Sequence, residues 1–457
     1  MQLFLKYIFV IQFFIISCSC SKNSNTDDDT TVVIPPLSDQ EILDLAQKDA
    51  FKYFWNYAEA NSKLARERYH VEESYVDANL VTTGGSGFGL MTILVGIERG
   101  FVTRGEAVGR LQTALTFLEN ADRFHGAWSH WINGTNGATV PFGTIDNGGD
   151  IVETSFLCQG LICIREYFKN GTEEEQAVAQ KADNLWKGVE WSWYTKGENA
   201  MYWHWSPNYE WQLNHKLQGY DECLIAYIMG VASPTHPIPA AAYHEAWARN
   251  GNIVSAGSHY GLPKIFNHNG ASVVGPMFWA HYSYLGLDPR GLTDQYANYW
   301  EVTQNHAKIM HAYCVANPGG YNGYGEDCWG LTASYSRNSN GTVGYTDHKP
   351  GNDRGVITPT AALSSFPYTP EESMKALRFF YENPQWKDRL IGVAGPYDAF
   401  SPHHDWVTKR YLAIDQGTIV PMIENYRTGF LWNLFMQAPE IQTGLQNLGF
   451  SSSQHGF

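Results

Sequence analysis

The stretch Thr144-Ile-Asp-Asn-Gly-Gly-Asp-Ile-Val-Glu-Thr-Ser-Phe156 joins a loop to a long apolar segment. Asp150 stands directly before that segment and Glu153 follows three residues later, which is the spacing of a capping box at a helix start. Asp146 precedes the two glycines, so three carboxylates lie near one predicted helix start. Capping alone explains Asp150 and Glu153, and the other helix starts decide whether these acids have a further role.

Apolar segments alternate with amphipathic, charged segments along the rest of the chain. The apolar segments lie near residues 84–100, 151–166, 222–231, 271–286, 355–366 and 415–435. The amphipathic segments lie near residues 38–55, 103–121, 173–190, 239–249, 292–315 and 371–382. A helix that is apolar all round is buried, and one with a polar stripe is peripheral.

Six helices of each kind predict an all-α fold, an (α/α)6 barrel or toroid with long loops at the mouth where the inner helices begin. Each inner helix is then returned by an outer one, and residues 38–457 form one catalytic domain. Short β-hairpins are expected only near residues 199–213 and 338–347.

Acids occur at three of the predicted inner-helix starts. They are Asp146, Asp150 and Glu153 at the second, Asp221 and Glu222 at the third, and Asp415 at the sixth. Compensation of the helix dipole, about 0.3–1 kcal/mol at an exposed end, explains one acid per helix but not several at one crowded mouth. Crowded carboxylates suit glycoside hydrolysis, in which one carboxyl stays protonated and another stays ionised.

Aromatic and polar side chains are frequent in the segments that lead to this mouth. The chain has 16 Trp and 27 Tyr, and such rings can stack on sugars, although large helical cores also use them. The candidate substrate-binding residues are Trp128, Trp131, Trp203, Trp205, Trp211, His215, Tyr220, Phe278, His281, Trp329, Arg354 and Tyr397.

The charge balance excludes several classes of ligand. The net charge is −15 and no dense Lys/Arg cluster is present, which argues against nucleic acids and acidic polymers and favours a neutral polysaccharide. The histidines lack H-E-x-x-H or comparable spacing, and the five cysteines from Cys158 onward lack a CxxC pattern. We therefore expect neither a metal site nor a disulfide framework.

The first 37 residues have the character of an export signal followed by a polar linker. Lys6 precedes a nearly unbroken apolar run within residues 1–17 that is too short for a confident membrane span. Ile15-Ile-Ser-Cys18 resembles a lipobox, which makes Cys18 the expected lipidation site; an ordinary secretory signal is the alternative. Residues 18–37 are typical of a disordered linker. We expect an exported bacterial lipoprotein, periplasmic or on the outer-membrane surface, that contacts the membrane only through its lipid.

Four motifs occur in order along the chain: Gly84-Gly-Ser-Gly-Phe-Gly-Leu-Met91, Asp146-Asn-Gly-Gly-Asp-Ile-Val-Glu153, Leu217-Gln-Gly-Tyr-Asp-Glu222 and Asp415-Gln-Gly-Thr418. Together they resemble the bacterial β-1,2-glucanases of glycoside hydrolase family 144, a group often labelled glucoamylase-like. The resemblance covers roughly residues 38–450. It implies an (α/α)6 barrel and cofactor-free hydrolysis of β-1,2-glucan to sophorose or short oligosaccharides, with inversion at the anomeric carbon.

The same resemblance implies roles for the acids. Its candidate catalytic residues fall on Asp146, Asp150, Glu153, Glu222 and Asp415. We expect Glu222 to be the general acid and Asp415 the base, with Asp150 as the alternative base. Relayed proton transfer through a substrate hydroxyl or a water molecule is compatible with this family. Asp146, Asp150 and Glu153 would then form the supporting wall of the site.

Three other functions remain open from the sequence. One is hydrolysis of an α-1,4-glucan, as the glucoamylase label suggests. Another is a non-catalytic, surface glycan-binding lipoprotein. A polysaccharide lyase is a third, but the acidic balance disfavours it because lyases need cations to receive the uronate carboxylate. We expect a monomer that needs no nucleic acid or cofactor.

Overall fold

The computed structural model describes residues 37–72, 77–269 and 273–457. Residues 39–457 form one compact unit. The expected signal segment 1–17, Cys18 and the linker as far as residue 36 lie outside the described residues, so they stay predictions. Within the described ranges, no helix combines the length and the apolar character needed to cross a membrane.

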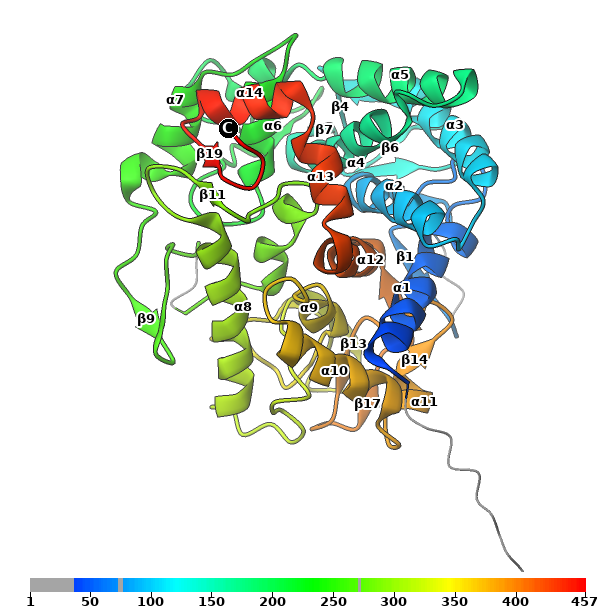
Figure 1. Cartoon of the computed structure of the whole chain (residues 1–457), viewed down its shortest axis with the longest axis vertical. Helices are drawn as coiled ribbons and strands as arrows, with labels where there is room; N and C mark the ends of the chain where they lie inside the picture. The colour runs from blue at the N-terminus through cyan, green and yellow to red at the C-terminus, as the bar shows by residue number, and fades with distance from the viewer. Residues whose placement is uncertain (1–36, 73–76, 270–272) are drawn as a thin grey trace, which may run out of the picture. The chain divides into compact units, whose positions relative to one another are not determined.

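Helices are the main regular elements of the unit (Figure 1). The α-helices are α1 (Asp39–Asn56), α2 (Thr83–Glu98), α3 (Arg104–Asn120), α4 (Ile151–Phe168), α5 (Glu173–Lys187), α6 (Leu224–Ala232), α7 (Ala240–Ala242), α8 (Tyr299–Ala316), α9 (Pro359–Leu363), α10 (Pro370–Glu382), α11 (Lys387–Leu390), α12 (Ala413–Thr428), α13 (Phe430–Met436) and α14 (Pro439–Asn447). The 3₁₀-helices are η1 (Trp191–Thr195), η3 (Arg249–Gly251), η4 (Met277–Ala280) and η5 (Tyr282–Tyr284), and η2 (Tyr243–Trp247) is a π-helix.

Helix α2 packs against both α4 and α12, and these three helices lie in the core. Nearly all of their residues are buried, as their apolar sequences predict. Glycines bring α2 and α4 close together: a Cβ atom on Gly87 would clash with the Phe156 carbonyl, and one on Gly160 would stand 2.5 Å from the Gly87 carbonyl oxygen. The glycine-rich start of α2 therefore serves close helix packing.

Peripheral helices cover this core. Helix α5 packs on α3 and α4, α1 packs on α12, and α14 packs on α6. Thr103 and Thr172 begin α3 and α5 with capping boxes, in which Glu106 and Glu175 reach back to the cap backbone. Buried and peripheral helices therefore alternate from α2 to α6, as predicted.

Two predicted inner helices are much shorter than expected. The described part of the segment near 271–286 forms the 3₁₀-helices η4 and η5, and only α9 forms near 355–366. Pro276 caps η4, and Pro359 occupies the first turn of α9. Proline is favoured at such starts and destabilises a helix interior, so new, short helices begin at these two positions.

Two further helices are interrupted. The segment near 239–249 is divided into α7, η2 and η3. The segment near 415–435 breaks at Gly429, whose φ of +70° ends α12 before α13 begins.

Short strands occupy the loops, which contain more β structure than the all-α prediction expected. The antiparallel pairs are β1 (Arg68–His70) with β18 (Arg410–Leu412), β3 (Arg123–Phe124) with β4 (Ala127–Trp128), β7 (Gly149–Asp150) with β8 (His204–Trp205), β9 (Ser258–His259) with β10 (Leu262–Pro263), β11 (Leu292–Thr293) with β19 (Ser451–Ser452), β12 (Ala333–Arg337) with β13 (Val343–Asp347), β14 (Ile391–Gly392) with β15 (Gly395–Pro396), β16 (Phe400–Ser401) with β17 (Trp406–Val407), and β5 (Trp131–Asn133) with both β2 (Leu80–Thr82) and β6 (Thr139–Val140). Strands this short carry no alternating sequence pattern.

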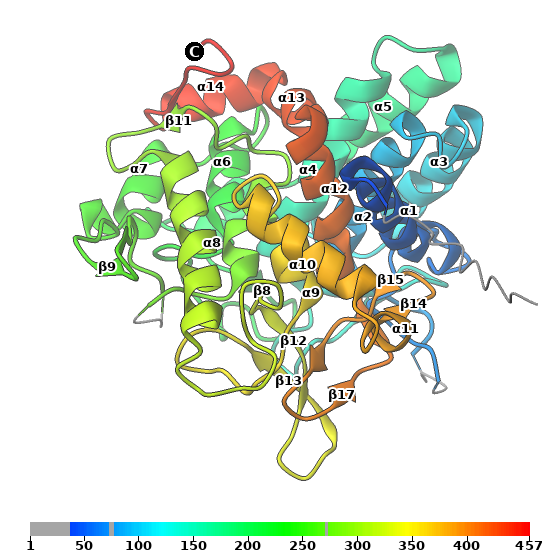
Figure 2. The ribbon, with the colours of Figure 1, turned by 60° about the horizontal axis from the view of Figure 1, so that its bottom comes forward.

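The predicted hairpin near 338–347 is present as β12 and β13. Near 199–213 the chain folds back through the antiparallel bridges Tyr202–Lys216 and Ser206–Glu210, and strand β8 also pairs with the distant β7. No sheet in the described part of the chain closes on itself. In both views β13, β14 and β17 lie toward the same end of the unit (Figure 2).

Candidate active site

A cavity of about 360 Å³ lies at the starts of α2, α4 and α12. It is lined by Glu67, Arg68, Thr82, His130, Trp131, Phe142, Glu153, Phe156, Trp203, Glu222, Phe278, Tyr282, Ala333, Tyr345, Leu412 and Ile414. Three carboxyl groups, those of Glu67, Glu153 and Glu222, therefore face one space together with several aromatic rings and few other apolar groups. This composition suits a sugar, whose ring faces are apolar and whose edge carries hydroxyls.

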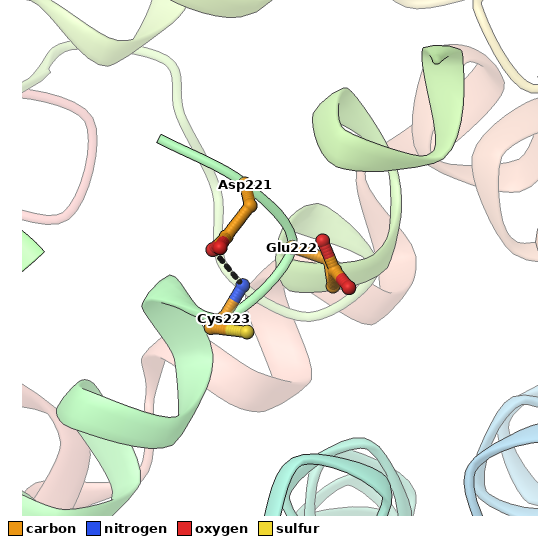
Figure 3. Close-up of side chains that lie close together, drawn as sticks. All are labelled: Asp221, Glu222 and Cys223. Carbon is orange, nitrogen blue, oxygen red and sulfur yellow. Dashed lines mark hydrogen bonds between the residues drawn. The ribbon is translucent and has the colours of Figure 1, made fainter. Parts of the chain in front are cut away.

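Glu222 lies just before α6 and lines this cavity. Its side chain and that of Asp221 leave different sides of the backbone turn, and the Asp221 carboxylate accepts the Cys223 amide at 2.9 Å (Figure 3). Burial and then the charge of Asp221 hold the pKa of Glu222 well above its usual range, and Glu153 and Asp150 add to the effect. A carboxyl group that stays protonated near neutral pH meets the requirement for a general acid.

The donor atoms of Asp221, Glu222 and Cys223 lie within 4.8 Å of one another. Asp221 already accepts hydrogen bonds from the Cys223 amide and from the Asn269 side chain, the latter at 3.2 Å. Burial raises the pKa of the Cys223 thiol well above its usual range, which disfavours the thiolate that a metal ligand requires. The group is poorly suited to a metal ion, and the expectation of a metal-free enzyme stays a prediction.

Glu153 connects the first turn of α4 to the first turn of α2. Its Oε2 atom accepts the Gly84 amide at 2.8 Å and the Thr82 hydroxyl at 3.4 Å. Burial raises the pKa of Glu153, the nearby His130 opposes that rise, and the charge of Asp150 adds to it. Because its Oε2 atom is held by α2, Glu153 has a fixed position on the cavity wall.

Asp150 is fully buried and uses both carboxylate oxygens internally. Oδ1 accepts the amides of Val152 and Glu153 at 3.0 and 2.9 Å, so Asp150 caps α4 as predicted. Oδ2 accepts the Trp203 indole N–H at 2.9 Å and lies 2.8 Å from His130 Nδ1. These four contacts occupy the lone pairs of the carboxylate, so Asp150 orients its neighbours and offers no oxygen to a water molecule.

Two histidines accompany the acids of this loop. Burial disfavours a charge on His130, but the charge of Glu153 and the hydrogen bond to Asp150 raise the pKa of His130 to about 9. Asp146 lies outside the cavity lining, with Oδ1 3.3 Å from His204 Nε2. Burial and the charge of Asp150 raise the pKa of Asp146 to about 6. An imidazolium at His130 therefore offsets part of the crowded negative charge.

Asp415 occupies the first turn of α12 but is almost completely buried. Its neighbours Leu412 and Ile414 line the cavity, whereas Asp415 is not among the lining residues. Burial and the charge of Asp398 hold the pKa of Asp415 well above its usual range.

Tyr282 connects the acids of three helices. Its side chain lines the cavity, and burial raises the pKa of its phenol well above the usual range. The charges of Asp415, Glu153 and Glu222 raise that pKa further. The charges of the acids that begin α12 and α4, and of Glu222 before α6, therefore all act on one hydroxyl group, so the structure brings Asp415, Glu153 and Glu222 into one neighbourhood.

Three of the predicted substrate-binding residues line the cavity. They are Trp131, Trp203 and Phe278. Trp205 and Trp211 lie outside it and contact Trp193, at ring-centroid distances of 5.8 and 6.3 Å. The ring of His215 packs against Trp203 at 5.2 Å.

Four predicted sugar platforms are core residues instead. They are Trp128, Tyr220, His281 and Trp329, each at most 2% exposed. The indole N–H of Trp128 donates to the Leu118 carbonyl at 3.0 Å, and that of Trp329 donates to the Glu372 carbonyl at 3.1 Å. Their polar groups are thus satisfied inside the protein, which lets the rings act as packing.

Two other predicted substrate-binding residues also lie outside the cavity lining. Tyr397 is 7% exposed and packs against Tyr411 at 5.1 Å. Arg354 is exposed. Both predictions rested on loop position, which does not fix where a side chain points.

Several cavity residues were not predicted from the sequence. They are Glu67, Arg68, Thr82, His130, Phe142, Phe156, Ala333, Tyr282, Tyr345, Leu412 and Ile414. Glu67 and Arg68 reach the cavity because β1 pairs with β18, which lies more than 300 residues later in the chain. A local sequence pattern does not predict such a pairing. His130 lay within the Trp128-Ser-His-Trp131 motif, where a histidine beside predicted carboxylates was an available signal.

Comparison with known proteins places these features in context. The family model described as "Putative glucoamylase" matches residues 214–439. An endo-β-1,2-glucanase of Chitinophaga pinensis, solved with sophorotriose and glucose, is 54% identical with a TM-score of 0.88, covering 91% of this chain and 99% of that one. A β-1,2-glucanase of Parabacteroides distasonis is 45% identical with a TM-score of 0.83, covering 91% of this chain and 60% of that one.

A curated relative from the same species is an exo β-1,2-glucooligosaccharide sophorohydrolase acting at the non-reducing end. It is 44% identical over 448 residues, which are 93% of this chain. The chain spans 60% of the length of that relative. The four motifs, the acid-lined cavity and the near-complete match to the Chitinophaga structure lead to one conclusion: the chain belongs to the bacterial β-1,2-glucanases of glycoside hydrolase family 144.

Proposed function

We propose that the protein hydrolyses β-1,2-glucan or its oligosaccharides and releases sophorose or short β-1,2-glucooligosaccharides. The observation that carries this proposal is the meeting of Glu222 and Glu153 in one aromatic-lined cavity. The relatives named above act on β-1,2-linked glucose, which favours this substrate over an α-1,4-glucan. The raised pKa of Glu222 argues for turnover, because a binding protein has no need of a protonated carboxyl in its cavity.

In the proposed reaction Glu222 is the general acid. It gives its proton to the leaving glycosidic oxygen, while a water molecule attacks the anomeric carbon from the opposite face. Asp415 acts as the base for that water, directly or through a substrate hydroxyl. Asp150 is unsuitable because four contacts occupy its oxygens. Attack from the opposite face inverts the anomeric configuration.

The remaining cavity residues bind the sugar. Trp131, Trp203 and Phe278 offer ring faces for stacking. Glu153, fixed by the Gly84 amide, accepts hydrogen bonds from sugar hydroxyls. Trp205 and Trp211 form an aromatic cluster with Trp193 outside the cavity, and a longer glucan chain could contact it.

We propose that the helical unit is an (α/α)6 barrel. Support comes from the alternation of buried and peripheral helices from α2 to α6 and from the starts of α2, α4 and α12 at one cavity. In this arrangement η4, η5 and α9 replace two full inner helices, and the short strands belong to the loops at the mouth.

Incubation with β-1,2-glucan, with soluble starch and with a β-1,3-glucan tests the proposed activity. We expect short β-1,2-linked products from the first polymer alone, and NMR of the first product should show the α-anomer. Glu222→Gln should lose about 10²–10⁴-fold in kcat, which is the typical contribution of general acid catalysis. Glucose from starch, or retained binding with no product from any polymer, would refute the assignment.

We also propose export as a lipoprotein through Cys18, in the periplasm or on the outer-membrane surface, with a monomeric catalytic unit. The sequence Ile15-Ile-Ser-Cys18 supports lipidation. Labelling cells with a clickable palmitate should mark the wild-type protein but not Cys18→Ala, with Cys20→Ala as the matched control. Light scattering on the leaderless protein should give the monomer mass.

A further inference from the structure

Two carboxyl groups from separate segments meet beside the start of α12. The Asp398 amide donates to the Arg410 carbonyl at 3.0 Å, which holds Asp398 alongside β18. Strand β18 continues directly into α12, whose first turn carries Asp415. Asp398 is 5% exposed and Asp415 is 2% exposed, and their side chains are hydrogen-bonded to each other.

The hydrogen bonds around the two groups favour a proton between them. Asp398 Oδ2 accepts the Tyr335 amide at 2.8 Å. Asp398 Oδ1 and Asp415 Oδ2 are buried, and neither has another hydrogen-bond partner in the described part of the chain. Ionised carboxylates can only accept hydrogen bonds, and two ionised carboxylates this close repel each other. One proton shared by the pair satisfies both of these oxygens.

Other charged and titratable groups surround the pair. They are Glu67 and Arg68 beside or on β1, Tyr335 on β12, Tyr345 on β13, Tyr282 on η5, and Arg410 on β18. Arg68 and the Tyr335 amide favour the ionised form of Asp398, whereas Glu67 opposes it. Among the described residues, neither a cation nor an amide favours an ionised Asp415.

The directions of the two pKa shifts agree with a pair in which Asp398 is ionised and Asp415 is protonated. Burial raises the pKa of Asp398 to about 6, and the hydrogen bonds with Asp415 and the Tyr335 amide limit that rise. Burial and the charge of Asp398 hold the pKa of Asp415 well above its usual range. In the resting enzyme Asp415 therefore carries the proton and Asp398 carries the charge.

We propose that Asp398 is a positioning residue that holds the negative charge of the pair and receives the proton that Asp415 relays during hydrolysis. This inference rests on the proposed function and deepens it. When water attacks, one of its O–H bonds breaks and that proton binds the second oxygen of Asp415. The proton that Asp415 held moves to Asp398, and Glu222 gives its own proton to the leaving oxygen. The negative charge thus passes from Asp398 to Glu222, and the protons balance.

Asp398→Asn tests this relay. The asparagine keeps an oxygen for the Tyr335 amide and offers an N–H to Asp415, but it cannot take up a proton. We expect kcat on β-1,2-glucan to fall at least tenfold with KM changed less than twofold, because Asp398 does not line the cavity. The acidic limb of kcat/KM should move to lower pH, because the amide N–H stabilises an ionised Asp415.

Asp353→Asn is the matched control. Asp353 is another carboxylate that accepts a backbone amide, that of Gly355 at 2.9 Å, together with the Tyr324 hydroxyl at 2.8 Å. It does not line the cavity, so its variant should keep the wild-type pH profile. An unchanged profile and kcat in Asp398→Asn, or an equal change in both variants, would overturn the inference.

A measurement without substrate separates this inference from the proposed function. An acid whose pKa is raised on folding destabilises the native state as pH rises through its folded pKa. The wild-type Tm should therefore decrease more steeply than that of Asp398→Asn between about pH 4 and pH 6, the unfolded and folded pKa values of Asp398. Equal slopes would refute the shared proton even if β-1,2-glucan is cleaved. A steeper wild-type slope without glucan cleavage would refute only the proposed substrate.

Discussion

The Gly84 amide donates a 2.8 Å hydrogen bond to Glu153 Oε2, and a Cβ atom on Gly84 would stand 2.6 Å from the same oxygen. The first turn of one core helix thus holds the carboxylate that begins the next. The absence of a side chain is what permits this contact, because real Cβ atoms essentially never approach so closely.

Gly84→Ala should displace Glu153 from its position on the cavity wall. We expect a loss of about 1–3 kcal/mol in the free energy of unfolding, as for other overpacked sites, and a fall in kcat/KM of at least tenfold. Gly109→Ala in α3 is the control, since nothing lies within 4 Å of a Cβ atom there. That variant should be as stable as the wild type or slightly more stable. Equal kinetics for the Gly84 variant and the wild type would contradict a role for this contact.

His130 should stay protonated well above neutral pH. NMR titration of the imidazole should give a pKa near 9 in the wild type and a clearly lower value in Asp150→Asn, because the variant removes a charged partner. A group whose pKa is raised on folding stabilises the native state fully below its unfolded pKa of about 6.5 and loses that contribution as pH rises through its folded value. The stabilisation that the protonated His130 imidazole provides should therefore be lost between about pH 6.5 and pH 9. A measured pKa at or below 6.5 would contradict the ion pair.

Two tryptophans of one motif should respond in opposite ways to truncation. Trp131 lines the cavity, whereas Trp128 is fully buried and bonded to Leu118. Trp131→Ala should raise KM for β-1,2-glucan about tenfold with little change in Tm, since one stacked ring contributes roughly 1–1.5 kcal/mol. Trp128→Ala should lose about 3–5 kcal/mol of stability. Thermal melts and kinetics on both variants check this, and a reversed pattern would mean that the cavity is wrongly assigned.

The sequence was informative where a structural element is long and its environment is uniform. The apolar runs that become α2, α4 and α12 predict buried helices, and Asp150 correctly marks the start of α4. It was less informative for 271–286, where an apolar, aromatic segment interrupted by glycine and proline forms 3₁₀-turns. Periodicity alone does not separate these outcomes.

The cavity itself depends on contacts between distant segments. Glu67 and Arg68 arrive through the pairing of β1 with β18, and Tyr345 arrives on the β12–β13 hairpin. For the tryptophans, residue type does not separate a sugar platform from a core ring. Trp128 and Trp203 both donate the indole N–H to a protein oxygen, but Trp128 is fully buried whereas Trp203 lines the cavity. The acids were easier to locate because a carboxylate at a helix start has a sequence position as well as a chemistry.

The charge of Asp221 should determine the pH at which kcat/KM falls on the alkaline side of its pH profile. After burial, Asp221 is the largest cause of the raised pKa of Glu222, and it does not line the cavity. Asp221→Asn keeps an oxygen for the Cys223 amide but removes the charge. A general acid works only while protonated, so lowering the pKa of Glu222 should move the alkaline limb of kcat/KM to lower pH, by about one unit for each 1.4 kcal/mol of lost repulsion. The rate at the optimum should change much less.

Tm measured alongside checks that the fold is kept, and Glu210→Gln, at an exposed carboxylate outside the cavity lining, is the control. An alkaline limb that stays in place while the variant remains folded would mean that Glu222 is not the proton donor.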